Sequence, residues 1–224
     1  MKKSMIIVAG GSGTRMEAEI PKQFIELNEK PILMHTLERM HAADDAMQLI
    51  LVLPANQMDE WEKLCNKHGF SLPHVMAEGG STRFLSVKSG LELAGGSALI
   101  GVHDGVRPLF TADLINRVFS EAAYSGAAIP VTPVIQSLRK VDGNKSQTVD
   151  RAEYRQVQTP QCFKTEVLQM GFANAKHVNY SDDAAVVEAN GALIGLVDGD
   201  LDNIKITTPI DLQLAELIIT RLPK

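Results

Sequence analysis

Apolar positions along this chain fall into short continuous runs that alternate with longer stretches of helical pattern. The continuous runs predict strands at residues 5–9, 49–53, 74–77, 98–102, 127–131 and 193–197. The helical patterns between them predict helices near residues 32–41, 57–68, 83–93 and 112–124. Continuous apolar strands that alternate with helices are typical of a mostly parallel sheet covered on both faces. We therefore expect a three-layer α/β/α fold.

The last predicted helix has a clear start. Thr208 is placed to act as the N-cap, Pro209 occupies the first helical position, and Asp211 follows three residues after the cap. The apolar residues that follow predict an amphipathic helix docked on the rest of the chain.

Residues 132–159 break the alternation. Scattered apolar residues flank a polar turn, Asp142-Gly143-Asn144-Lys145, which predicts a hairpin-like arm that leaves the sheet. The alternative interpretation is a long surface loop. A two-stranded arm is only marginally stable alone in water, so we expect it to pack on another surface.

Length, charge and cysteine content narrow the class of protein. The 224 residues suit one α/β domain over residues 1–224 with the arm as an extension. The net charge of −5 and the lack of a basic tail argue against a nucleic-acid partner. No apolar run reaches the roughly 18 residues of a membrane span, and the polar start is too short for a signal peptide. Cys65 and Cys162 lie far apart, so we expect a cytoplasmic protein with free thiols.

The segment after the first predicted strand carries the strongest indication of chemistry. It reads Ala9-Gly10-Gly11-Ser12-Gly13-Thr14-Arg15-Met16 and is followed by Pro21-Lys22-Gln23-Phe24. A glycine-rich turn after a buried strand brings backbone N–H groups close to a polyanion. With two cations, Arg15 and Lys22, nearby, the pattern indicates a nucleoside triphosphate and chemistry at phosphorus. It matches neither the dinucleotide fingerprint nor the P-loop, and a plain turn is the alternative interpretation.

Five further blocks follow in an order that resembles the nucleotidylyltransferases, which activate sugars and alcohols as nucleoside diphosphate derivatives. They are Gly79-Gly80-Ser81-x-Arg83-x-x-Ser86, Val102-His103-Asp104-Gly105-Val106-Arg107-Pro108, Thr148-Val149-Asp150-Arg151, Gln158-Thr159-Pro160-Gln161 and Asp202-Asn203-Ile204-Lys205-Ile206-Thr207. The resemblance covers nearly the whole chain and implies a Rossmann-like nucleotidyltransferase fold with a protruding β-arm.

Within that group the blocks are most similar to the cytidylyltransferases of the non-mevalonate isoprenoid pathway. This similarity implies transfer of CMP from CTP to 2-C-methyl-D-erythritol 4-phosphate, with release of pyrophosphate. Two alternatives stay open. One is a ribitol 5-phosphate cytidylyltransferase, which shares the nucleotide loop and two of the blocks. The other is a non-catalytic nucleotide-binding relative.

The resemblance also implies roles for single residues toward CTP. Arg15 and Lys22 are the expected catalytic pair, because the reaction brings an anion to an anion and mainly needs charge stabilisation. Asp104 is expected at the ribose, at Mg²⁺ or at both, and Arg83 either braces its loop or faces the phosphates. Ser81 is also placed to cap a helix, and it stands where many relatives carry Asp. The other expected nucleotide-binding residues are Ala9, Gly10, Gly11, Gly13, Gly80 and Ser86.

The acceptor needs further cations for its own phosphate. By resemblance Lys205 comes from the same subunit, whereas Arg151 and Ser137 come from the arm of a partner, so the resemblance implies a homodimer formed through the arm. Arg107 is expected to orient Asp104 or to contact the acceptor, and Ser181 is the remaining expected acceptor residue. Mg²⁺ is the expected cofactor because CTP is highly charged, with Asp104 and Asp202 as candidate ligands.

Overall fold

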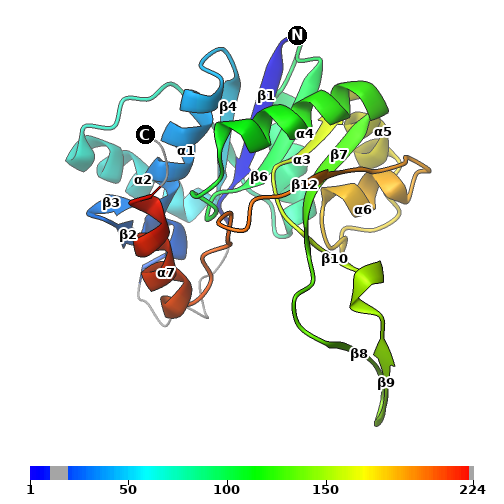
Figure 1. The fold of residues 1–224 in the computed structure, drawn as a ribbon. Helices are drawn as coiled ribbons and strands as arrows, with labels where there is room; N and C mark the ends of the chain where they lie inside the picture. Colours follow the sequence, from blue (N-terminus) through cyan, green and yellow to red (C-terminus); the bar gives the residue numbers. More distant parts are fainter. Residues whose placement is uncertain (11–19, 222–224) are drawn as a thin grey trace.

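The computed structural model describes residues 1–10 and 20–221. Within them, eight strands form one twisted sheet that lies between two layers of helices (Figure 1). The sheet order is β10-β7-β11-β6-β1-β4-β5, and β12 pairs with β7. The strands are β1 (Lys3–Val8), β4 (Gln48–Leu53), β5 (Val75–Glu78), β6 (Leu99–Asp104), β7 (Ala127–Pro133), β10 (Arg155–Val157), β11 (Gln161–Lys164) and β12 (Gly195–Asp198).

Most strands of the sheet run in one direction. β1 pairs in parallel with β4 and β6, β4 with β5, and β12 with β7. The exceptions among the described residues are β11, which is antiparallel to both β6 and β7, and β10, which is antiparallel to β7. The predicted mostly parallel α/β/α fold is thereby confirmed.

Alternate residues of the central strand β1 point to opposite faces and build two separate cores. Met5 and Ile7 join one cluster with α1 (Ile32–Ala43), α2 (Ala55–His68) and α4 (Ala112–Ser125). Ile6 joins the other cluster with α3 (Arg83–Leu93), α5 (Thr165–Ala173) and α6 (Asp183–Glu188). Because β1 is buried on both faces, its sequence reads as a continuous apolar run rather than an alternating one.

The C-terminal helix α7 (Pro209–Ile219) starts as predicted. The Thr208 side chain accepts a hydrogen bond from the Asp211 N–H, and Asp211 Oδ2 accepts from the Thr208 N–H at 2.8 Å. This capping box orients α7, which packs through Ala215 and Ile218 on a third cluster that includes Leu27 and Val106. Smaller elements complete this region: η2 (Lys22–Phe24), β2 (Glu26–Leu27) and β3 (Lys30–Pro31).

The predicted arm is present but shorter than expected. β8 (Leu138–Asp142) pairs with β9 (Lys145–Val149) across a turn at Gly143, where φ is +55°, and η3 (Arg151–Glu153) follows. Figure 1 shows this hairpin extending away from the sheet. The predicted limits 132–159 are wrong at both ends. β7 continues to Pro133, and β10 returns to pair with it before the buried Gln158 and Thr159.

Other differences from the sequence prediction are local. Each predicted strand and helix is found, with its ends shifted by at most two residues. The pattern missed β2, β3, β10, β11, α5 and α6, which have few residues or mixed polarity. Among the described residues, no helix combines the length and the apolar character needed to cross a membrane.

Candidate active site

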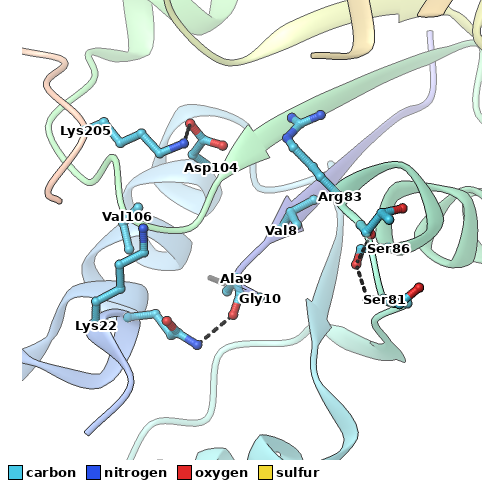
Figure 2. Close-up of a pocket in the computed structure, with 13 residues that line it drawn as sticks. Val8, Ala9, Gly10, Lys22, Ser81, Arg83, Ser86, Asp104, Val106 and Lys205 are labelled. Atoms are coloured by element: carbon cyan, nitrogen blue, oxygen red, sulfur yellow. Dashed lines mark hydrogen bonds and ion pairs between the residues drawn. The ribbon is translucent and has the colours of Figure 1, made fainter. Parts of the chain in front are cut away.

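A pocket of about 310 Å³ opens where β1 and β6 end. Ligands of open α/β sheets bind at this carboxyl edge of the parallel strands. Figure 2 shows Asp104 joined to Lys205 on one side of the pocket, Arg83, Ser81 and Ser86 on the other, and Lys22 below Val106 in this view. The remaining lining residues are Val8, Ala9, Gly10, Gln23, Gly80 and Thr82.

The end of β1 forms one wall of the pocket. The Ala9 N–H donates to the Val52 carbonyl at 3.0 Å, which carries the edge of the sheet one residue beyond the strand. The Ala9 carbonyl accepts from Nε2 of the fully buried Gln23 at 2.7 Å. This bond fixes η2 against β1 and thereby places the neighbouring Lys22 on the pocket. Gly11, Gly13 and Arg15 lie outside the described residues.

The loop between β5 and α3 forms the opposite wall. A side chain at Gly80 would place its Cβ 2.3 Å from Cβ of Leu85, so this close turn requires glycine. The predicted N-cap at Ser81 is wrong. Thr82 caps α3, with its hydroxyl accepting from the Leu85 N–H at 3.2 Å, because the helix starts one residue later than that prediction required. Ser81 is exposed at the pocket, and the buried Ser86 hydroxyl donates to the Thr82 carbonyl at 3.0 Å.

Asp104, the last residue of β6, is the centre of the charged side of the pocket. Its Oδ2 lies 3.0 Å from Lys205 Nζ and 3.1 Å from Arg107 Nε. Burial alone would raise the pKa of Asp104, but Lys205, Arg107 and Arg83 outweigh it and hold that pKa well below the usual range. The carboxylate therefore stays ionised, and Arg107 orients it.

A buried polar network behind Asp104 joins three of the sequence blocks. Thr159 Oγ1 accepts from the Asp104 N–H at 3.1 Å and contacts His103 Nδ1 at 3.1 Å. The side-chain amide of Asn203 donates to the Thr159 backbone carbonyl at 2.9 Å. The backbone carbonyl of Asn203 accepts from Arg107 Nη1 at 2.8 Å. These bonds hold the segment before Lys205 against the end of β6, so they set the position of the Lys205 backbone.

His103 is a structural member of this network. With Thr159 on Nδ1, the ring donates from Nε2 to the Arg107 carbonyl at 3.0 Å. Complete burial lowers the pKa of His103 to about 4, although the Arg107 carbonyl and Asp104 oppose that shift. The imidazole is therefore neutral at physiological pH and does not act as a cation toward the pocket.

Several predicted site residues lie away from this pocket. Ser137 and Arg151 are exposed on the arm, where Arg151 donates to the Ile135 carbonyl. Ser181 is exposed just before Asp182, which caps α6. Asp202 is also exposed and does not line the pocket, although it precedes Lys205 by three residues. The sequence blocks suggested no role for three residues that contact side chains or backbone of the site. They are Thr159, Asn203 and Asp183.

The described part of the lining has more cations than carboxylates. Lys22, Arg83 and Lys205 face a single carboxylate, that of Asp104. Across residues 1–10 and 20–221, no group of three or more His, Cys, Asp or Glu side chains could hold a metal ion by itself. Such a pocket is suited to a polyanion, with any divalent cation bound mainly by the polyanion's own oxygens.

Comparisons with known proteins bear on the identity of that polyanion. A family model described as 2-C-methyl-D-erythritol 4-phosphate cytidylyltransferase matches residues 4–221. Proteins of that name from Bacteroides thetaiotaomicron and Bacteroides fragilis are 48% and 47% identical over 219 residues, which is 98% of this chain and 100% of each relative.

Solved structures give the same result for the fold. The crystal structure of 2-C-methyl-D-erythritol 4-phosphate cytidylyltransferase from Thermus thermophilus is 36% identical, with a TM-score of 0.82, and the match covers 99% of this chain and 100% of that one. The 4-diphosphocytidyl-2C-methyl-D-erythritol synthase from Anaerococcus prevotii is 27% identical, with a TM-score of 0.84 and coverage of 98% and 96%.

Proposed function

This chain belongs to the 2-C-methyl-D-erythritol 4-phosphate cytidylyltransferase family, and we propose that the pocket beside Asp104 is where it carries out that reaction. The enzyme transfers the cytidylyl group of CTP to 2-C-methyl-D-erythritol 4-phosphate and forms 4-diphosphocytidyl-2-C-methyl-D-erythritol. A phosphate oxygen of the acceptor attacks the α-phosphorus of CTP. The bond from that phosphorus to the bridging oxygen breaks, and pyrophosphate leaves with the electron pair.

The observation that carries this proposal is the convergence of Lys22, Arg83, Asp104 and Lys205 on one pocket from four separate parts of the chain. The attacking group is already an anion, so the reaction needs no strong general base. Catalysis then depends on positioning and on stabilising negative charge that spreads in the transition state. A pocket in which cations outnumber carboxylates among the described lining residues fits this requirement.

We assign the two walls of the pocket to different parts of CTP. Gly80, Ser81 and Ser86 form the wall that would hold the cytosine, and Asp104 would accept hydrogen bonds from the ribose. Ala9, Gly10 and Lys22 form the wall that would hold the phosphates. On sequence grounds Arg15 and Lys22 have the same expected role, and the position of Lys22 on the pocket supports that role for Lys22.

Mg²⁺ remains part of the proposal. Asp104 fits a shared site, because Mg²⁺ usually uses one or two carboxylates together with substrate phosphates and water. The ion would neutralise charge on the triphosphate when bound. The exposed position of Asp202 gives it no support as a second ligand. Arg107 holds the Asp104 carboxylate in place for either role.

The arm supports the proposed homodimer. Ile135 is 72% exposed and Val141 is 69% exposed, so the arm carries apolar side chains that its own chain leaves uncovered, and a lone hairpin is only marginally stable in water. A partner would cover them and would bring Ser137 and Arg151 to a second pocket, where they would bind the acceptor phosphate.

The free thiols of Cys65 and Cys162 fit the proposed cytoplasmic location.

Pyrophosphate release with CTP and Mg²⁺ tests the reaction, with methylerythritol phosphate and ribitol phosphate offered in parallel. We expect turnover with methylerythritol phosphate. Turnover with ribitol phosphate alone would keep the mechanism but overturn the acceptor. Release with neither acceptor would overturn the proposed activity, and calorimetry with CTP would then identify a nucleotide-binding relative without catalysis.

A further inference from the structure

Arg83 reaches the pocket while paired with a buried carboxylate from a distant part of the chain. Its Nη2 lies 2.7 Å from Oδ2 of Asp183, and the two side chains are 28% and 1% exposed. A carboxylate removed from water this completely needs an ionic partner. Because Arg83 is the first residue of α3 and Asp183 the first of α6, the contact joins two helices across the edge of the pocket.

The backbone of Asp183 is held rigidly. Gln161 on β11 is buried, and its Oε1 accepts from the N–H groups of Asp183 at 3.0 Å and Ala184 at 2.9 Å. The same amide donates from Nε2 to Asp182 Oδ2 at 2.9 Å. The start of α6 is thereby fixed to the sheet, and the Asp183 carboxylate provides a fixed anchor for the guanidinium.

Arg83 remains charged in this setting. Burial alone would lower the pKa of its guanidinium, but Asp183, Asp104 and Asp182 raise it above its ordinary value. The ion pair uses Nη2, and a guanidinium has further N–H donors at Nε and Nη1 in a fixed planar arrangement. Figure 2 shows the Arg83 side chain extending from α3 above Val8, on the same wall as Ser86.

Of the two roles that the family resemblance implies for Arg83, we propose nucleotide binding, with Asp183 as the positioning residue that aims its guanidinium. The inference rests on the proposed function of the pocket. It concerns CTP rather than the acceptor, because Arg83 lies on the wall with Gly80, Ser81 and Ser86.

A purely structural ion pair explains the geometry less well. Buried ion pairs add little stability compared with apolar side chains of similar size, so folding alone gives weak reason for this pair. An Asp in the first turn of α6 also interacts favourably with the helix dipole, but an exposed position would serve that purpose equally. Asp183 is buried and Arg83 lines the pocket, so the ion pair fixes the direction in which the Arg83 guanidinium points.

The test uses Arg83→Gln, Asp183→Asn and the double variant, with Asp44→Asn as the matched control. Asp44 forms an ion pair with Lys3 at 2.8 Å and is not part of the pocket lining. Calorimetry with CTP and Mg²⁺ gives the dissociation constant, and steady-state rates give KM for methylerythritol phosphate. Circular dichroism checks that each variant is folded.

We expect Arg83→Gln to weaken CTP binding about 10- to 100-fold, as expected for lost hydrogen bonds to a charged group. Asp183→Asn should weaken CTP binding at least fivefold, and the double variant should bind CTP as Arg83→Gln does. KM for the acceptor should change less than twofold, and the control should bind CTP normally. Multiplying effects in the double variant, or unchanged CTP binding in either single variant, would overturn the inference.

A conservative variant keeps the test usable if those proteins do not fold. Arg83→Lys retains a cation for Asp183 but loses the planar arrangement of donors, so it should fold and still bind CTP at least fivefold more weakly. Normal CTP binding by Arg83→Lys would also contradict the inference. If the wild-type enzyme turns over CTP and methylerythritol phosphate, normal CTP binding by Arg83→Lys overturns only this inference and leaves the proposed function intact. An inactive wild type would instead refute the proposed function.

Discussion

At the scale of single residues, one oxygen of Asp104 pairs with two cations of different accessibility. Lys205 and Arg107 both approach Oδ2, yet they differ in accessibility: the Lys205 side chain is 40% exposed and that of Arg107 is 13% exposed. Arg107 is further tied to the Asn203 carbonyl. Arg107 is therefore a fixed support, whereas we propose that the more exposed Lys205 exchanges Asp104 for a substrate phosphate.

This difference predicts the effect of removing Lys205. Lys205→Met should lower kcat/KM for methylerythritol phosphate about 10- to 100-fold, because one charge-assisted hydrogen bond to the acceptor is lost. Lys67→Met is a suitable control, since the Lys67 ion pair with Glu26 is largely exposed and contributes little. Steady-state kinetics with both variants would check this, and equal kcat/KM values would contradict it.

His103 predicts a specific dependence of stability on pH. Its pKa of about 4 in the fold lies below the roughly 6.5 of an unfolded histidine, so the unfolded chain binds the extra proton as the pH falls. The contribution of neutral His103 is complete above about pH 6.5. It is lost progressively down to about pH 4, at up to about 1.4 kcal/mol per pH unit.

The check is urea unfolding of the wild type and of His103→Gln between pH 4 and pH 8. The variant should show a smaller loss of unfolding free energy than the wild type across the lower half of this range. Thr159→Val tests the network separately, because it removes the hydroxyl next to His103 without removing the titrating ring. Parallel pH profiles for wild type and His103→Gln would exclude His103 as the source.

At the scale of elements, the start of α7 predicts a second stability effect. Asp211 Oδ2 accepts from the N–H groups of Thr207 and Thr208 and from the Thr207 hydroxyl. Partial burial raises the pKa of Asp211, but these hydrogen bonds outweigh it and lower the pKa below its ordinary value. The cap therefore stabilises the fold above about pH 4 and loses that effect as Asp211 becomes protonated.

Asp211→Ala should reduce the unfolding free energy by about 1 kcal/mol at neutral pH. The difference from wild type should shrink as the pH falls below about 4. Thermal or urea unfolding at both pH values provides the measurement, with Glu216→Ala on the same helix as a control outside the cap. A difference that stays constant with pH would mean that the carboxylate charge is not what stabilises the cap.

The elements also show which parts of the structure can be predicted from sequence. β1, β4 and β6 were predictable because they are buried on both faces and read as continuous apolar runs. β11 reads Gln161-Cys162-Phe163-Lys164, and its place between two long strands depends on contacts that no local pattern encodes.

The candidate site also has parts that can be predicted from sequence and parts that cannot. Asp104 and Lys205 could be proposed because each stands in a recognisable block, and the structure pairs them at 3.0 Å. The contact between Arg83 and Asp183 could not, because one hundred residues separate them and either one reads as an ordinary helix start. The roles of Arg15, Ser137 and Arg151 remain predictions.

At the scale of the whole molecule, the arm predicts sharing of active sites between subunits. Lys22→Ala removes a residue of the pocket, and Arg151→Ala removes a residue of the arm. Each variant homodimer should have very low activity. Mixed dimers should regain activity, because one of their two sites combines an intact pocket with an intact partner arm.

Pyrophosphate release after unfolding and refolding the two variants together measures this recovery. Differently tagged chains confirm that mixed dimers form, and refolding each variant alone is the control. Confirmed mixed dimers without recovered activity would show that Arg151 acts within its own chain or not at all.

The position of β11 has a consequence for the order in which this protein can assemble during synthesis. β6 and β7 are not paired with each other, and each forms its ladder with β11. Until residues 161–164 leave the ribosome, the nascent chain therefore has two unpaired strand edges, and exposed edges invite association with other chains. The same short strand carries Gln161, which fixes Asp183. Closure of the sheet and placement of Asp183 thus depend on the same short segment, so a chain that lacks it would lose both together.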